Sequence, residues 1–413
     1  MADQQGGPGA PPGSASGTTA SGGPAGPDRG PVRDRRWVRA QDILPSAKVT
    51  AASVLLALAI GAVLIAVSTP SVISSGGYFL ADPGATFAAV GNAIGSSYWA
   101  LLQGCVGSWN AVANTLVNAA PLICAGLGVT LAFRAGLFNI GAQGQMLLGA
   151  AFCGLLGFHF HLPVGIHILA ALMGGLVGGA VFGAVAGVLK ARTGAHEVIV
   201  TIMMNYVASA ILDWLLGLRP FQQSGSNNKI SPAVDSNAAF PQIAGVHIGV
   251  ILAFVAAIAV WWLLNRTTLG FKMRAVGANP AAARTAGMSV AYAYTMAMLI
   301  AGLLAGLAGA EQMQGNQVQL SDSFGGTVGF DAITVSLLGR ASPLGTVLAG
   351  LLFGALDAGG TQMQAIAGTS VSLVEIIQAL IVIFVAAPML VKVIFRFRKV
   401  GGEGAMMAKG WSS

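Results

Sequence analysis

Long apolar runs recur along the chain and are separated by short polar segments. A helix needs about 20 apolar residues to cross a hydrocarbon layer of about 30 Å. Runs of about that length lie at 49–68, 111–132, 140–158, 164–189, 198–216, 247–264, 291–310 and 372–394, and two shorter runs at 328–338 and 344–356. The pattern predicts an all-α polytopic membrane protein with about ten transmembrane helices, some of them short or broken.

Composition supports this interpretation and excludes a soluble protein. The 413 residues are 55% hydrophobic and only 8% charged, whereas soluble domains carry about 25% charged residues. In lipid, helices associate through close contact between small side chains. Among the 58 glycines, those in the fourth run are spaced for such contact, namely Gly174, Gly175, Gly178, Gly179, Gly183 and Gly187.

The distribution of basic residues predicts the orientation of the chain. Of the 21 Lys and Arg residues, only Arg219 and Lys229 fall on the predicted outer side. Cytoplasmic loops carry the excess of positive charge, so both termini are expected in the cytoplasm and residues 218–246 outside. Residues 70–108 contain both apolar and polar residues and are expected to form an amphipathic segment at the outer interface.

Three regions follow from composition. Residues 1–45 are expected to form a disordered cytoplasmic tail, because the Gly-, Ala-, Pro- and Ser-rich part before the basic cluster cannot bury enough apolar surface to fold. Residues 46–399 form the predicted transmembrane domain, and residues 400–413 a short cytoplasmic tail.

The stretch 270–288, GFKMRAVGANPAAARTAGM, combines several positive charges with helix-start signals between two apolar runs and is expected to form a cytoplasmic helical loop. Asn279 can cap a short helix and Pro280 suits its first position, and the helix is expected to stop at Gly287. A surface of small side chains there would let another protein come close, and it consists of Ala281, Ala282, Ala283 and Ala286. The alternative interpretation is a basic loop that only fixes orientation.

Residues 138–145 interrupt the helical pattern with two glycines and with the amides Asn139, Gln143 and Gln145. Irregular backbone at membrane depth survives when it is buried in protein or lines water. This stretch therefore either lines a translocation path or forms a tight turn in which Asn139 caps the next helix.

Other polar residues lie in or at the ends of apolar runs. A carboxylate inside a membrane is costly unless it faces water, pairs or sits at an interface. The candidates for a path are Asn118, Glu197, Asn205 and Asp331, although Glu197 and Asp331 could simply cap helices. These two acids open helices expected to run in opposite directions, as inverted repeats would require. The polar cluster at 311–319 is either an outer gate, a docking surface or a solvated loop.

Several activities are excluded. No Gly is followed by Lys anywhere in the chain, so the phosphate-binding P-loop is absent. Of the 14 Asp and Glu residues only a few lie near apolar runs, and none of these is expected to form a pair with a nearby His. The three cysteines show no metal-ligand spacing. The chain is expected to be no enzyme and to bind neither a metal nor a cofactor, and its net charge of +7 reflects membrane orientation, not nucleic-acid binding.

The motifs resemble a known family. Residues 277–288 fit G-A-N-P-x-A-A-x-x-A-G-M, which resembles the coupling loop of permease subunits in bacterial ATP-binding-cassette importers of the branched-chain amino acid, ribose and nucleoside type. Residues 114–150 are similar to the nucleoside branch, of guanosine type, with T-L-x-x-A-x-P-L followed by A-F-R-x-G-x-F-N-I-G-x-x-G-Q. Further matches lie at 197–206 and 329–345.

The resemblance implies a permease subunit in the bacterial cell membrane that imports nucleosides. The implied coupling residues are Arg274, Gly277, Asn279, Pro280, Ala282, Ala283 and Gly287. The implied partners are a cytoplasmic ATPase, a second permease, expected to be a different paralogue, an extracellular binding lipoprotein and membrane lipid. The alternatives are a sugar importer of ribose type and an ion-coupled secondary transporter.

Overall fold

The computed structural model describes residues 40–77, 79–226 and 228–386. The chain divides into a short unit, Met1–Ser46, and a large unit, Ala47–Ser413. The expected tail at 400–413 and nearly all of the expected tail at 1–45 lie outside the described residues.

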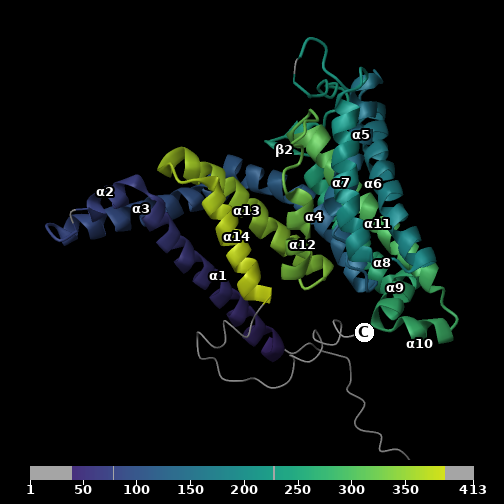
Figure 1. Cartoon of the computed structure of the whole chain (residues 1–413), viewed down its shortest axis with the longest axis horizontal. Helices are drawn as coiled ribbons and strands as arrows, with labels where there is room; N and C mark the ends of the chain where they lie inside the picture. Colours follow the sequence, from purple (N-terminus) through teal and green to yellow (C-terminus); the bar gives the residue numbers. More distant parts are fainter. Residues whose placement is uncertain (1–39, 78, 227, 387–413) are drawn as a thin grey trace, which may run out of the picture. The chain divides into compact units, whose positions relative to one another are not determined.

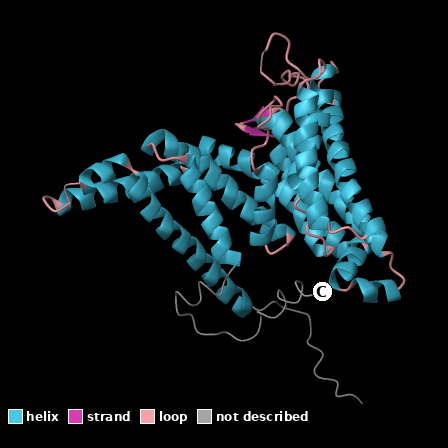
Figure 2. Ribbon diagram, viewed as in Figure 1, coloured by secondary structure: helices cyan, strands magenta, loops and turns pink. Residues whose placement is uncertain are grey.

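Helices make up almost all of the described chain (Figures 1 and 2). In order, the elements are α1 Ala40–Ser68, α2 Pro70–Gly76, α3 Pro83–Val106, α4 Trp109–Arg134, α5 Ala142–His159, α6 Ile166–Thr193, α7 Glu197–Leu216, β1 Gln242–Ile243, β2 Val246–His247, α8 Gly249–Arg266, α9 Thr268–Ala278, α10 Pro280–Thr285, α11 Val290–Glu311, a π-helix Gln312–Asn316, α12 Val328–Leu338, α13 Pro343–Ala367 and α14 Val371–Ala386. Among the described residues, the departures from the all-α prediction are the antiparallel pair β1–β2 and an isolated bridge between Ile230 and Ser321.

Seven of the described helices are long and apolar enough to cross a membrane, which confirms a polytopic membrane protein. The run at 328–338 matches α12. The prediction that the run at 344–356 is too short was wrong, because α13 continues through polar residues to Ala367 and has 25 residues. The mixed segment at 70–108 forms α2 and the 24-residue helix α3.

One end of the large unit is covered by the loop between α7 and α8, and we call it the loop end. Backbone amides of this loop donate to partners from elsewhere in the chain: Asp235 to Gly157 O at the end of α5, and Val234 to Val318 O beyond α11, both at 2.9 Å. Figure 1 shows β2 at this end and α10 at the opposite one.

The opposite end carries Arg134, Lys190, Arg284 and Arg340, and we call it the basic end. The side chain of Arg134 donates to Ala341 O at 2.6 Å, which joins the turn after α4 to the turn before α13. Lys190 and Arg284 line one pocket. The predicted topology assigns these four basic residues to one side, so the fold is consistent with it; which side faces the cytoplasm stays a prediction.

The core forms around α4, α5, α6 and α11, and α6 packs on α11 through small residues. A Cβ added to Gly175 would lie 2.9 Å from the Cβ of Ala310, and one added to Gly183 would lie 2.9 Å from the Cα of Gly302. Such spacing leaves no room for larger side chains. The prediction of close helix packing through the glycines of the fourth run is confirmed.

Candidate functional site

Two short helices, α9 and α10, form the loop that the sequence analysis singled out. Asn279 ends α9 and caps α10, where its Oδ1 accepts from the backbone N–H of Ala282 at 3.0 Å, and Pro280 takes the first helical position. After α10, the N–H of Met288 donates to Ala283 O, and Gly287 has φ +79°. This is the left-handed termination that favours glycine. The predicted start and stop of the helix are therefore confirmed.

The small side chains of α10 do not all face outward. Ala281, Ala282 and Ala286 are exposed, but Ala283 is only 4% exposed and packs with Val276, Val290 and Ala293. The expectation that Ala283 belongs to an exposed face was wrong, because this side of a one-and-a-half-turn helix rests on α9 and α11. The exposed alanine surface therefore consists of Ala281, Ala282 and Ala286.

Charge on these helices stays at the surface. Arg274 of α9 is exposed, and its Nε donates to Gly270 O one turn back, at 3.4 Å. Arg284 of α10 is exposed as well. Both guanidinium groups are thus available to a partner at the basic end.

The α9–α10 pair touches the turn after α4 through backbone. A Cβ added to Gly277 would lie 2.8 Å from the carbonyl carbon of Ala135 and from the N of Gly136, and closer still to the carbonyl oxygen of Arg134. In return, a Cβ added to Gly136, which has φ +76°, would meet the Cα of Gly277 at 2.9 Å. Two glycines therefore allow two backbones to touch, and the loop helices bear directly on the turn that leads to residues 138–145.

Residues 137–141 form irregular backbone, as the glycines predicted. The side chains of Asn139 and Gln145 are 0% and 2% exposed and pair with each other: each amide nitrogen donates to the other's oxygen, at 3.1 and 3.3 Å. Asn139 Oδ1 also accepts from the N–H of Gly141 at 3.0 Å. The irregular stretch is thus buried in protein, with its polar groups satisfied by amides.

Gln143 joins the first turn of α5 to the first turn of α12. Its Oε1 accepts from the N–H of Gly329 at 2.7 Å and its Nε2 donates to Gly326 O at 3.0 Å. Asn205 of α7 braces the same region, since its Oδ1 accepts from the N–H of Gly144 and its Nδ2 donates to Ile140 O, both at 2.9 Å. The structure therefore brings together four of the predicted path residues: Asn139, Gln143, Gln145 and Asn205.

The other three predicted path residues lie apart from this cluster. Glu197, the first residue of α7, pairs with Lys190 Nζ at 2.8 Å at the basic end. Asp331 lies in the first turn of α12, where it accepts from Thr327 Oγ1 at 2.7 Å, and Asn118 is half-buried on α4. Because α7 starts at the basic end and α12 runs toward it, the two acids open helices of opposite direction, as predicted. Whether the helices form inverted repeats stays a prediction.

Sequence reasoning missed an acid near Asp331. Asp357 of α13 accepts from Gln378 Nε2 of α14 at 2.7 Å and interacts electrostatically with Asp331 and Glu375. Hydropathy falls after Leu356, so the predicted span ended one residue short of it. Had the helix been extended, an acid inside an apolar span would have marked Asp357 as a candidate.

The polar cluster after α11 is buried at the loop end. Glu311, Gln312 and Gln314 are 0%, 6% and 1% exposed, so the solvated-loop alternative was wrong for these three. Glu311 Oε1 accepts from Cys124 Sγ at 3.4 Å. The cluster continues as a π-helix, a rare element that is frequent at functional sites.

His247 of β2 belongs to this buried cluster, and sequence reasoning did not single it out. The ring is stacked on Phe240, and its Nε2 lies 3.0 Å from Asn316 Oδ1. Since an amide oxygen only accepts, Nε2 carries the proton. Burial lowers the pKa of His247. Within the part of the chain that the structure describes, His247 Nδ1 and Glu311 Oε2 have no hydrogen-bond partner.

No group of three or more His, Cys, Asp or Glu side chains suited to a metal ion occurs among residues 40–77, 79–226 and 228–386. The polar clusters around Gln143 and Glu311 consist mainly of amides and carboxylates with the imidazole of His247, and such groups can recognise a polar solute through hydrogen bonds.

Comparison with known proteins identifies what this arrangement resembles. The family described as "Branched-chain amino acid transport system / permease component" matches residues 111–386. A guanosine ABC transporter permease of Bacillus subtilis is 38% identical over 72% of this chain and 87% of its own length. A glucose ABC transporter permease of Haloferax volcanii is 37% identical over 65% and 74%, and a nucleoside ABC transporter permease of Lactococcus lactis is 32% identical over 72% and 84%. No solved structure matches the chain.

Proposed function

Since the chain belongs to the family of branched-chain amino acid transport system permease components, we propose that it forms the membrane path of an ATP-binding-cassette importer for nucleosides. The chain is a multi-pass membrane subunit. Because it contains no P-loop, the energy for transport comes from an ATPase subunit.

The observation that carries this proposal is the backbone contact between Gly277 and the turn at 134–136. On its other side, α10 exposes Ala281, Ala282 and Ala286, a surface that offers little packing of its own. An ATPase bound to that surface would push on α9 and α10, and the contact would pass the movement to the residues before α5.

The path itself is proposed to follow the first turns of α5 and α12. The side-chain amides near these turns bond to one another and to backbone, so they stabilise the fold of this part of the path; they are Asn139, Gln143, Gln145 and Asn205. Asn118 and Asp331 are half-buried and are the better candidates to contact the solute. Glu197, paired with Lys190, holds the inner end of α7.

Nucleosides are the proposed substrates because two of the relatives, including the one at 38% identity, transport guanosine or nucleosides by their names. The glucose permease of Haloferax volcanii makes a simple sugar the second candidate. The partners implied by the family are a cytoplasmic ATPase, a second permease of a different sequence and an extracellular binding lipoprotein.

The proposal is tested by uptake in cells that lack their own nucleoside importers and express the chain with the adjacent ATPase, second permease and binding protein. We expect uptake of labelled guanosine that stops when the ATPase is omitted and that unlabelled adenosine, but not glucose, inhibits. Uptake of glucose in place of guanosine would show a sugar importer. Uptake that persists without the ATPase and collapses with the proton or sodium gradient would show a secondary transporter.

A further inference from the structure

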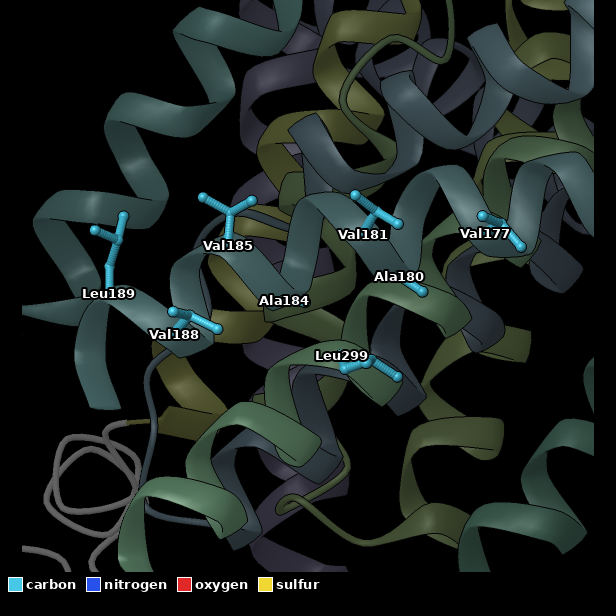
Figure 3. A pocket seen from close by; sticks show the side chains of 8 residues that line it. All are labelled: Val177, Ala180, Val181, Ala184, Val185, Val188, Leu189 and Leu299. Atoms are coloured by element: carbon cyan, nitrogen blue, oxygen red, sulfur yellow. The ribbon is translucent and has the colours of Figure 1, made fainter. Parts of the chain in front are cut away.

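An apolar groove runs along α6 beside α11, and Figure 3 shows the side chains that line it. Its volume is about 540 Å³, and every lining residue is aliphatic: Val177, Ala180, Val181, Ala184, Val185, Val188, Leu189 and Leu299. Most of the valines are about half exposed. Nothing in the groove could bind a polar solute, so its occupant is a hydrocarbon chain or an apolar side chain.

The length of the groove matches one leaflet of a bilayer. Val177 and Leu189 are twelve residues apart on one helix, or about 18 Å at 1.5 Å per residue. Half of the hydrocarbon core of a bilayer is about 15 Å thick. One extended acyl chain would therefore lie along the groove from the middle of the membrane to its surface.

A polar pocket of about 450 Å³ lies at the basic end of the same two helices. Lys190, which directly follows Leu189, lines it together with Arg284 of α10 and Tyr294 of α11. Lys190 is neutralised by Glu197 at 2.8 Å, whereas Arg284 makes no ion pair within the described ranges. The pocket therefore carries a net positive charge, and its phenol and guanidinium groups can donate hydrogen bonds to a phosphate.

We propose that this site binds one anionic phospholipid of the leaflet at the basic end, with an acyl chain in the groove and its phosphate between Arg284 and Tyr294. The two parts of the site fit the two parts of such a molecule, and charge complementarity selects an anionic over a zwitterionic headgroup. Basic pockets between helices at the cytoplasmic side are suited to such headgroups.

The consequence concerns α10, because Arg284 lies on the helix that we propose to contact the ATPase. A phosphate held by Arg284 and by residues of α6 and α11 would tie α10 to the transmembrane helices. This effect on coupling rests on the proposed function, but the lipid binding does not.

The test measures lipid retained by the assembled importer after purification from nanodiscs of defined composition, by native mass spectrometry. We expect the wild type to retain phosphatidylglycerol in preference to phosphatidylcholine. Arg284→Gln should weaken phosphatidylglycerol retention about fivefold, the worth of one basic residue near a membrane surface. Lys272→Gln is the matched control, because Lys272 is exposed on α9 and does not line the pocket, and it should retain phosphatidylglycerol as the wild type does.

A second variant tests the groove. Ala184→Trp fills it and should also release phosphatidylglycerol while leaving the subunits assembled. Equal retention of the two lipids, or unchanged retention in Arg284→Gln, would overturn the proposal. Retention of phosphatidylglycerol by Ala184→Trp would also overturn it, because the pocket then binds an anion without an acyl chain. Loss of the second permease from Ala184→Trp would overturn it as well, because the groove then binds a protein helix. Failure of nucleoside uptake in the wild type would count against the proposed function alone.

Discussion

Replacing Gly277 with Ala tests the contact on which the coupling proposal depends. The added methyl group would lie 2.8 Å from the carbonyl carbon of Ala135, well inside ordinary carbon–carbon contact of about 3.5 to 4.0 Å. The turn at 134–136 is held in place, because the side chain of Arg134 donates a hydrogen bond to Ala341 O. The two backbones must therefore separate.

Overpacking at such a site costs about 1 to 3 kcal/mol. Ala in place of Gly also gains up to about 1 kcal/mol of helix propensity, but α9 gains this whether or not it is docked. The equilibrium between docked and separated backbones therefore shifts by the overpacking cost alone, which is about 5- to 150-fold.

The assay compares ATP hydrolysis and nucleoside uptake in the reconstituted importer. We expect Gly277→Ala to retain its ATPase subunit and to hydrolyse ATP, with uptake per ATP reduced about fivefold or more. Gly95→Ala is the control, because a Cβ at Gly95 on α3 meets nothing within 4 Å, and its uptake should match the wild type. Normal coupling in Gly277→Ala would refute the role given to this contact.

Two further predictions concern single side chains. Ala282→Glu places an exposed acid at the third position of α10, where a Glu favours the helix start. We expect this variant to show normal protein levels but to lose the ATPase on co-purification. Ala283→Glu instead buries the acid among Val276, Val290 and Ala293, which should cost several kcal/mol of stability and lower the amount of protein. Ala282→Glu that keeps its ATPase would exclude the alanine surface as the docking site. Gln143→Leu leaves the N–H of Gly329 and the carbonyl of Gly326 without their partner, at about 1 to 3 kcal/mol each, so less folded protein should be recovered by size-exclusion chromatography; normal recovery with lost uptake would instead assign Gln143 to the path.

Hydropathy predicted the existence of nearly every described membrane helix, because apolar length is the dominant signal in a lipid environment. Local end signals were also sufficient where they were strong, as at Asn279, Pro280 and Gly287. The extent of α13 was missed because hydropathy falls at Asp357 and at the Gly, Thr and Gln residues after it, whereas this part of the helix packs against α3 and α14.

The candidate site was predicted as a set of residue types but not as an arrangement. The sequence placed Asn139, Gln143, Gln145 and Asn205 among the candidates. Asn139 and Gln145 pair with each other, however, whereas Gln143 and Asn205 bond to distant backbone groups, up to 186 residues away for Gln143 and Gly329. Periodicity on a six-residue helix likewise cannot show which alanine of α10 is buried, because that depends on how α9 and α11 pack on it.

Helix α11 is one of the helices that join the two ends of the large unit. α11 starts at Val290, which packs against Ala283 of α10, and ends at Glu311, in the buried cluster of the loop end. Its 22 residues span about 33 Å. Gly249 lies between His247 and Glu311 in that cluster, since a Cβ added to it would lie 2.7 Å from His247 Nδ1 and 3.1 Å from Glu311 Cγ.

Not every polar atom of this buried cluster is hydrogen-bonded. Glu311 Oε2 and His247 Nδ1 lack partners in the described part of the chain, and an unpaired buried polar group costs about 1 to 3 kcal/mol. A shift of α11 driven from α10 would therefore change the environment of Glu311 and His247, whose unpaired atoms lose no hydrogen bond when they move. Helix α11 thus links the helix that carries the exposed alanines at the basic end to buried polar groups without partners in the described chain at the loop end.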